Sequence, residues 1–156
     1  MKFRIVAVGK IKEDYFRAAV DEYVKRLSRF AVTEIVEVEE CLFRGTPNQK
    51  EIDKILQTEG KSILAKCEGC VVLLDTKGKQ LDSVQLSEAI SRRKLTTSTF
   101  TFVIGGSNGL SDEVRARADM SLCFGKITLP HQLCRVVLVE QLYRACCIAN
   151  NIPYHK

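Results

Sequence analysis

Apolar and polar positions along this chain follow two different periods, and segments of the two kinds alternate from end to end. Strands are predicted where β-branched and aromatic residues form short runs bounded by turn residues. These runs cover residues 3–8, 34–38, 71–74, 100–104 and 120–124. Helices are predicted where apolar residues recur every three or four positions, at 13–29, 48–66, 81–94, 111–118 and 130–150. Asn48 suits the N-cap of the second helix, which Gly60 is expected to interrupt.

The order of the predicted elements favours an α/β fold. A helix separates each strand from the next, so no two strands can pair through a short hairpin. This order predicts a single domain, residues 1–156, built on an open parallel sheet. Ligands of such sheets bind beyond the carboxyl ends of the strands. That rule selects the loops at 75–79, 105–110 and 125–130.

Residues 105–110, Gly-Gly-Ser-Asn-Gly-Leu, form the most glycine-rich of these loops. Glycines let a backbone approach a ligand closely, although a tight strand-to-helix turn would explain them equally well. The spacing matches neither GxGxxG nor a Walker motif. Asp112 and Glu113 follow at the start of a helix, where they complement its dipole and would repel a phosphate. The loop therefore favours a neutral or cationic ligand.

The other two loops offer an apolar slot and a carboxylate. Residues 125–130 combine aliphatic side chains with free backbone groups, which suits an adenine ring. Pro130 is expected in the first turn of the last helix, with Thr128 as its candidate cap. Asp75 follows a strand and could hold a ribose hydroxyl, but a solvated surface aspartate is its expected role.

The last predicted helix carries apolar residues on nearly all sides between Leu133 and Ile148. One side can face the sheet, but the others need a second cover. We expect a second copy of the chain to provide it, forming a homodimer; a central helix buried on every side is the alternative. Pro153 then ends the helix and leaves a short tail of Tyr154, His155 and Lys156, which by itself is typical of a frayed terminus.

Composition and charge change this picture little. The chain has 156 residues, 46% hydrophobic and 28% charged, which excludes a disordered or low-complexity protein. No apolar run reaches the length of a membrane helix, and the first residues lack the pattern of a signal peptide, so no membrane partner is expected. A net charge of +5 is compatible with a polyanionic partner but does not require one.

Seven cysteines without a secretory signal indicate reduced thiols in the cytoplasm. Cys67 and Cys70 form a CxxC pair, which could belong to a redox protein or to half of a zinc site. The pair precedes a strand instead of opening a helix, and a zinc site needs a second pair of ligands. Buried apolar thiols are the expected role, and no metal site is predicted.

Several segments together resemble the RlmH family, the ribosomal RNA large subunit methyltransferases H. They are Met-Lys-Phe-Arg-Ile-Val-Ala-Val-Gly-Lys at 1–10, Phe-Val-Ile-Gly-Gly-Ser-Asn-Gly-Leu at 102–110, Ile-Thr-Leu-Pro-His-Gln at 127–132, Arg-Val-Val-Leu-Val-Glu-Gln-Leu-Tyr-Arg-Ala at 135–145 and Pro-Tyr-His-Lys at 153–156. The resemblance implies a SPOUT-class α/β methyltransferase with a C-terminal trefoil knot. Such a knot is an exception to the general rule that a protein chain does not pass through its own loops. It also implies a homodimer that uses S-adenosylmethionine (SAM) to methylate N3 of a pseudouridine in 23S ribosomal RNA.

The resemblance assigns the SAM contacts by position. They lie in the three loops selected above or directly before them: Leu74, Gly105, Phe124, Gly125, Lys126, Ile127, Thr128 and Leu129. At the C-terminal end, His155 is expected to accept the N3 proton, because the pKa of an imidazole lies near neutrality. Tyr154 is expected to stack on the base or order the tail, and Arg144 to hold a phosphate or a carbonyl oxygen. These three residues would complete a site across the dimer.

Other basic residues are candidates for RNA phosphate contacts or for solvated surface positions. They are Lys10, Lys12, Arg92, Arg93, Lys94 and Arg135. Two other functions stay open at this point. One is a non-catalytic RNA-binding module, which the charge permits although no motif of stacking aromatics supports it. The other is a redox protein based on the CxxC pair.

Overall fold

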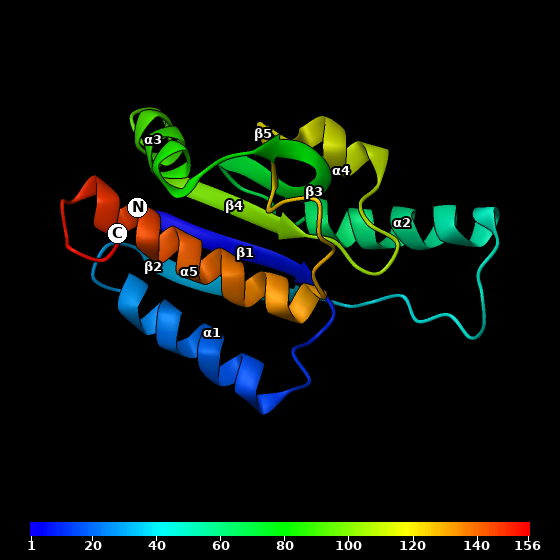
Figure 1. The fold of residues 1–156 in the computed structure, drawn as a ribbon. Helices are drawn as coiled ribbons and strands as arrows, with labels where there is room; N and C mark the ends of the chain where they lie inside the picture. The colour runs from blue at the N-terminus through cyan, green and yellow to red at the C-terminus, as the bar shows by residue number, and fades with distance from the viewer.

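The computed structural model describes residues 1–156 and centres on five parallel strands in the order β2-β1-β4-β3-β5 (Figure 1). The strands are β1 (Lys2–Val8), β2 (Val32–Val38), β3 (Cys70–Gln80), β4 (Thr99–Ile104) and β5 (Met120–Cys123). The helices are α1 (Asp14–Leu27), α2 (Gln49–Leu64), α3 (Ser83–Arg93), α4 (Asp112–Arg117) and α5 (His131–Ala149). Each predicted element is present, and the predicted parallel α/β sheet is confirmed.

Helices cover both faces of the sheet, so the central strands are buried on both sides. Phe3 and Ile5 of β1 pack in one apolar cluster with α1, α3 and α5. Val6 and Val8 of the same strand pack in a second cluster, with α2 and α4. This division follows from the two-residue period of a strand. Burial on both faces also explains why the first half of β3 is continuously apolar; β4 is likewise buried at every position after Thr99.

The expected N-cap of α2 is confirmed, but Gly60 does not interrupt the helix. Asn48 Oδ1 accepts from the Glu51 amide at 3.1 Å, and the Glu51 carboxylate accepts from the Asn48 amide at 2.7 Å. This reciprocal pair satisfies two backbone donors of the first turn. At Gly60 a Cβ would lie 2.5 Å from Oγ of Ser111, the N-cap of α4. The glycine therefore lets two helices approach, and this packing outweighs its low helix propensity.

The predicted end of β3 at Leu74 is wrong, because the strand continues to Gln80. Leu74 and Lys79 both pair with Leu122 of β5, and the residues between them form an excursion from the sheet. Gly78 lies directly against this backbone, since a Cβ there would be 2.7 Å from the carbonyl carbon of Leu122. The segment expected as an open loop at 75–79 is therefore folded tightly over β5.

Helix α5 packs on the sheet with α1 and α3 on its two sides (Figure 1). Leu138, Val139 and Leu142 are completely buried. Val136 and Val137 are only half-buried. The flanking helices therefore cover most of the apolar surface of α5 but leave part of it exposed. None of the five helices combines the length and apolar character that crossing a membrane requires.

Candidate functional site

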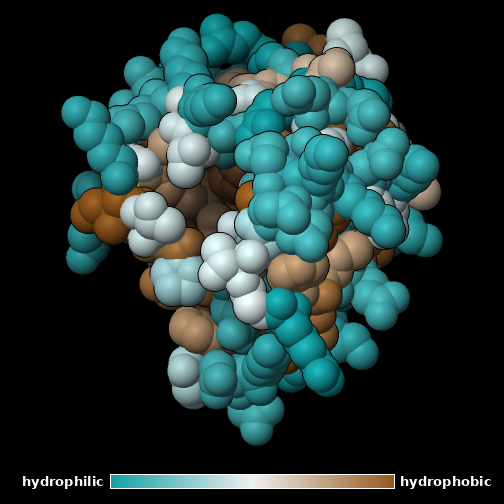
Figure 2. Space-filling view, turned by 90° about the vertical axis from the view of Figure 1, so that its right-hand side faces the viewer, coloured by the Kyte–Doolittle hydropathy of each residue, from teal (hydrophilic) through white to brown (hydrophobic).

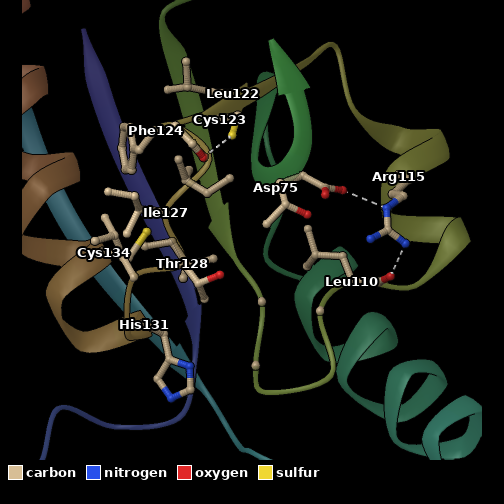
Figure 3. Close-up of a pocket in the computed structure, with 18 residues that line it drawn as sticks. Asp75, Leu110, Arg115, Leu122, Cys123, Phe124, Ile127, Thr128, His131 and Cys134 are labelled. Atoms are coloured by element: carbon tan, nitrogen blue, oxygen red, sulfur yellow. Dashed lines mark hydrogen bonds and ion pairs between the residues drawn. The ribbon is translucent and has the colours of Figure 1, made fainter. Parts of the chain in front are cut away.

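A cavity lies at the carboxyl ends of β3, β4 and β5, where the sequence predicts ligand binding. Figure 2 looks onto this end of the sheet and shows a hollow with an apolar interior, and Figure 3 shows its lining. The cavity is lined by seven of the eight residues that the resemblance implies for SAM: Leu74, Gly105, Phe124, Gly125, Ile127, Thr128 and Leu129. Lys126 is the exception: it is exposed and does not line the cavity.

The glycine-rich loop after β4 forms one wall of the cavity. The Gly109 amide donates to the Gly106 carbonyl at 3.0 Å, so the loop turns back on itself. Leu110 then inserts into the apolar cluster beneath α4. A Cβ at Gly105 would lie 2.6 Å from the Gly109 carbonyl oxygen. Glycine at this position is therefore needed by the turn, and it also leaves its backbone open to the cavity.

The loop between β5 and α5 forms the opposite wall. Gly125 has a φ of +132°, which side chains of L-residues rarely allow. Ile127 is 82% exposed although it is apolar, and it lines the cavity beside Thr128 (Figure 3). An exposed apolar side chain at a cavity wall suits a flat apolar ligand. Pro130 is the N-cap of α5 instead of a first-turn residue, and no side chain caps the helix, so the capping role expected for Thr128 is wrong.

Asp75 and Arg115 form an ion pair on a third side of the cavity (Figure 3). Arg115 Nε donates to Asp75 Oδ2 at 2.8 Å. The Asp75 side chain is only 7% exposed, so the expectation of a solvated surface aspartate is wrong. Burial by itself raises the pKa of Asp75, but the Lys77 amide and the Arg115 guanidinium outweigh it and hold the pKa below its ordinary value. Sequence reasoning missed Arg115, because its partner lies 40 positions away.

Other lining residues were not selected from the sequence, among them Cys123, His131 and Cys134. The Cys123 thiol donates to the Gly125 carbonyl at 3.0 Å, which steadies the loop after β5. Burial raises the pKa of Cys134 to about 11, so this thiol stays protonated at neutral pH and serves as apolar lining. His131 is the first residue of α5 and lies at the edge of the cavity (Figure 3).

Cys67 and Cys70 lie outside the cavity, where the chain enters β3. Burial raises the pKa of both thiols above the ordinary value of a cysteine, although neighbouring arginines oppose the shift. Reactive redox cysteines have a lowered pKa. The structure therefore gives no support to the redox alternative. The chain contains no cluster of three or more His, Cys, Asp or Glu side chains placed to hold a metal ion.

The predicted catalytic residues Arg144, Tyr154 and His155 come together near the C-terminal end of α5. Arg144 Nη1 lies 3.4 Å from Nδ1 of His155, and its guanidinium carbon lies 4.7 Å from the centre of the Tyr154 ring. Glu140 connects the group, because its Oε1 accepts from the Tyr154 hydroxyl and from Arg144 Nε, both at 3.0 Å. Sequence reasoning missed Glu140, although its spacing of four residues from Arg144 is a recognisable helix signal. Tyr154 is therefore held against the helix and is not frayed.

The cavity and this tail cluster lie at different ends of α5. Arg144 follows His131 by 13 residues along the helix. At a rise of about 1.5 Å per residue, the two are separated by roughly 20 Å along the axis. Within one chain, the structure does not bring the predicted proton acceptor to the predicted SAM site.

Arg135 is fully buried, so the expectation that it contacts RNA phosphates is wrong. Its Nη1 donates to Glu37 at 2.8 Å, and its Nη2 donates to the carbonyls of Val8 and Gly9 at 2.9 and 2.7 Å. Burial lowers the pKa of Arg135, which Glu37 partly offsets. The residue ties the first turns of α5 to the end of β1. The other basic candidates remain accessible: Lys10, Lys12, Arg92 and Lys94 are exposed, and Arg93 is half-buried.

Glu59 of α2 is buried behind the glycine-rich loop with one oxygen unpaired. Its Oε1 accepts from the Cys41 amide at 2.9 Å. Its Oε2 has no partner and lies 3.1 Å from where a Cβ of Gly106 would be. Burial raises the pKa of Glu59, the Cys41 amide opposes this shift, and the charge of Glu40 adds to it.

A raised folded-state pKa makes the contribution of Glu59 to stability fall as pH rises. The contribution is complete below the unfolded pKa of about 4.3 and is lost as pH increases through the folded value. We expect Glu59→Gln to be more stable than the parent by on the order of 1 kcal/mol at pH 8, and by much less at pH 4. Urea unfolding at both pH values measures the difference. Asp53→Asn, at an exposed carboxyl of the same helix, should show no such dependence; an equal effect of Glu59→Gln at both pH values would contradict the prediction.

Comparison with known proteins identifies the family of the whole chain. A family model described as "Predicted SPOUT methyltransferase" matches residues 1–155. The chain belongs to the SPOUT methyltransferase family. This SPOUT protein is 48% identical over 161 residues to the ribosomal RNA large subunit methyltransferase H of Limosilactobacillus reuteri, with 100% of both chains covered. It is 46% identical over 159 residues to the ribosomal RNA large subunit methyltransferase H 1 of Clostridium perfringens, again with 100% of both covered. These relatives confirm the resemblance to the RlmH family.

The fold of this SPOUT protein also matches solved structures. A "probable methylase family protein" of Haemophilus influenzae superimposes with a TM-score of 0.56 at 12% sequence identity. The match covers 99% of this chain and 70% of the other. At this identity the likeness shows a shared fold and nothing more.

Proposed function

We propose that this SPOUT family member transfers a methyl group from SAM to N3 of a pseudouridine in 23S ribosomal RNA. The observation that carries the proposal is the cavity at the carboxyl ends of β3, β4 and β5. It gathers, from three separate loops, seven residues that the family resemblance assigns to SAM. The names of the full-length relatives support ribosomal RNA of the large subunit as the substrate.

The lining of the cavity fits SAM. Apolar side chains from two walls, including Phe124 and Ile127, suit the faces of an adenine ring. Gly105 and Gly125 leave backbone groups open for the polar edge of that ring, and Asp75 offers a carboxylate to hydroxyl groups. When bound, SAM supplies a methyl group that its sulfonium has already activated. The protein then has to hold the donor and align the acceptor nitrogen with it, and no metal is proposed.

The acceptor N3 carries a proton that must leave as the nitrogen attacks. We assign its removal to His155, with Arg144 holding a phosphate or carbonyl oxygen of the RNA and Tyr154 stacking on the base. These side chains lie roughly 20 Å along α5 from the cavity of their own chain. A homodimer in which the tail of one copy reaches the cavity of the other would bring them together. The half-buried Val136 and Val137 support a contact between copies on α5.

The path of the chain around β5 supports a trefoil knot in this region. Leu74, before the excursion of β3, and Lys79, after it, both pair with Leu122. Gly78 crosses so close to the backbone of Leu122 that no side chain would fit. We propose that the excursion of β3 between Leu74 and Lys79 forms part of a loop, and that the chain leading from β5 into α5 passes through this loop.

Isotope transfer tests the function directly. The purified protein is incubated with methyl-labelled SAM and with ribosomes from cells that lack this activity, and the label is located by nuclease mapping and mass spectrometry. We expect one methyl group on a pseudouridine of 23S RNA. Ile127→Asp, which places a charge on the exposed apolar wall of the cavity, serves as the inactive control. Ribosome binding without any transfer would favour the RNA-binding alternative, and a methyl group on another base would contradict the proposed specificity.

The homodimer leads to a prediction about mass and about shared sites. Sedimentation at micromolar concentration should give twice the chain mass of 17.6 kDa. Mixing a chain that lacks residues 154–156 with full-length Ile127→Asp should restore activity that neither has alone. The reason is that one of the two mixed sites would combine an intact cavity with an intact tail. An active monomer, or a mixed dimer without activity, would contradict this arrangement.

A further inference from the structure

Arg115 is the only lysine or arginine among the residues that line the cavity. It is held from two directions, because Nε donates to Asp75 at 2.8 Å and Nη1 donates to the Leu110 carbonyl at 2.5 Å. The close-up shows both contacts as dashed lines (Figure 3). An arginine fixed through two of its three nitrogens presents the third in a defined direction.

The third nitrogen, Nη2, has no hydrogen-bond partner in the protein. It lies 3.9 Å from the position that a Cβ of Gly109 would take, next to the glycine-rich wall. The remaining charge near the guanidinium is Asp112, whose fully exposed carboxylate is 3.7 Å from Nη1. Solvent screens that pair strongly. The guanidinium thus keeps a donor free at the cavity wall.

We propose that Arg115, oriented by Asp75, binds the α-carboxylate of the methionyl part of SAM through Nη2. This inference rests on the proposed function, since it assumes that SAM occupies the cavity. The α-carboxylate is the only anionic group of SAM, and Arg115 is the only permanent cation of the lining. A charge-assisted contact of this kind fixes the amino-acid end of the ligand, and with it the direction of the sulfonium.

An RNA phosphate is the competing anion, and the surroundings of Arg115 disfavour it. The carboxylate of Asp75 already occupies one edge of the guanidinium. Asp112 and Glu113 add two negative charges in the first turn of α4. Even when partly screened, they disfavour a polyanionic RNA strand more than SAM, whose sulfonium and amine give it a net positive charge. The free nitrogen also lies beside Gly109, on the wall assigned to the cofactor.

A pair of ligands that differ in one group tests the inference. Decarboxylated SAM keeps the nucleoside, the sulfonium and the amine but lacks the α-carboxylate. Calorimetry on the wild-type protein should show SAM binding about 10- to 100-fold more tightly, the worth of one charge-assisted hydrogen bond. In Arg115→Gln this preference should fall close to unity, with the affinity for decarboxylated SAM almost unchanged. Arg117→Gln removes the same charge from the same helix outside the cavity and should keep the full preference.

The outcomes separate this inference from the function on which it rests. Equal affinities of the wild type for the two ligands would overturn it without any substitution. An unchanged preference in Arg115→Gln would also overturn it, and weaker RNA binding in that variant would then assign the nitrogen to a phosphate. If the wild type bound neither ligand, the proposed function itself would fail.

Discussion

Deletion of residues 154–156 is expected to abolish methyl transfer to ribosomes while leaving the fold and the affinity for SAM intact. The deleted residues lie outside both buried clusters, and the cavity is built from loops at the other end of α5. The deletion removes the Tyr154 and His155 side chains that Glu140 and Arg144 hold together. Label transfer to ribosomes, calorimetry with SAM and circular dichroism measure the three properties. A deleted chain that still transfers methyl groups would contradict any catalytic role of the tail.

The finer prediction concerns His155 alone. If this imidazole accepts the N3 proton, His155→Ala should lower the rate by roughly 10²- to 10⁴-fold, the usual worth of a general base. The pH–rate profile should also lose its acidic limb, because the imidazole must be neutral to accept a proton. Lys156→Ala, at the exposed neighbouring position, should keep both the rate and the limb. A loss below tenfold with the limb retained would mean that His155 only positions RNA and that solvent accepts the proton.

Gly105→Val is expected to remove most of the SAM affinity. The new Cβ would lie 2.6 Å from the Gly109 carbonyl oxygen and 3.0 Å from a methyl group of Leu110. The turn would have to open, so the cavity would lose the wall that this loop forms. Overpacking of this kind costs about 1–3 kcal/mol. If a cost of about 3 kcal/mol destabilises the SAM-bound form, the affinity for SAM falls roughly 100-fold. Calorimetry with SAM measures the change.

The matching control for that variant is Asn108→Ala, which changes the same loop without adding bulk and without touching the cavity lining. It should bind SAM as the parent does. Thermal unfolding should show that Gly105→Val still folds cooperatively, since the buried strand that precedes the loop is unchanged. Parental affinity in folded Gly105→Val would remove the glycine-rich loop from the SAM site.

Much of the fold could be predicted because its signals are local. The periods of apolar residues mark strands and helices, and the pair Asn48 and Glu51 marks a helix start through contacts only three residues apart. The strict alternation of strands and helices then restricts the sheet to a parallel one. The three loops predicted to bind a ligand follow from that topology, since parallel strands end at the same edge, and residues of all three line one cavity. Gly60 shows the limit of this reasoning: α2 continues through it, and the close approach of the distant Ser111, which leaves no room for a Cβ, cannot be read from neighbouring residues.

Buried charges could not be predicted, because each depends on partners far away in the sequence. Arginine is usually found at the surface. Arg135 is buried because Glu37 and the carbonyls of Val8 and Gly9 accept hydrogen bonds from its guanidinium. Asp75 was expected in solvent, but the excursion of β3 places it against Arg115 in the cavity. Neither pairing leaves a periodic signal that a single sequence could show.

The sequence by itself therefore determined the order and type of the elements, the edge of the sheet where the cavity lies, and the family. Those properties rest on contacts between near neighbours and on motifs that can be read in order. Only the tertiary structure decided which charges line the cavity, and that the tail lies at the far end of α5 from it. These facts depend on how segments 40 or more positions apart pack together, and packing of that kind is specified by the whole fold instead of by any one stretch of residues.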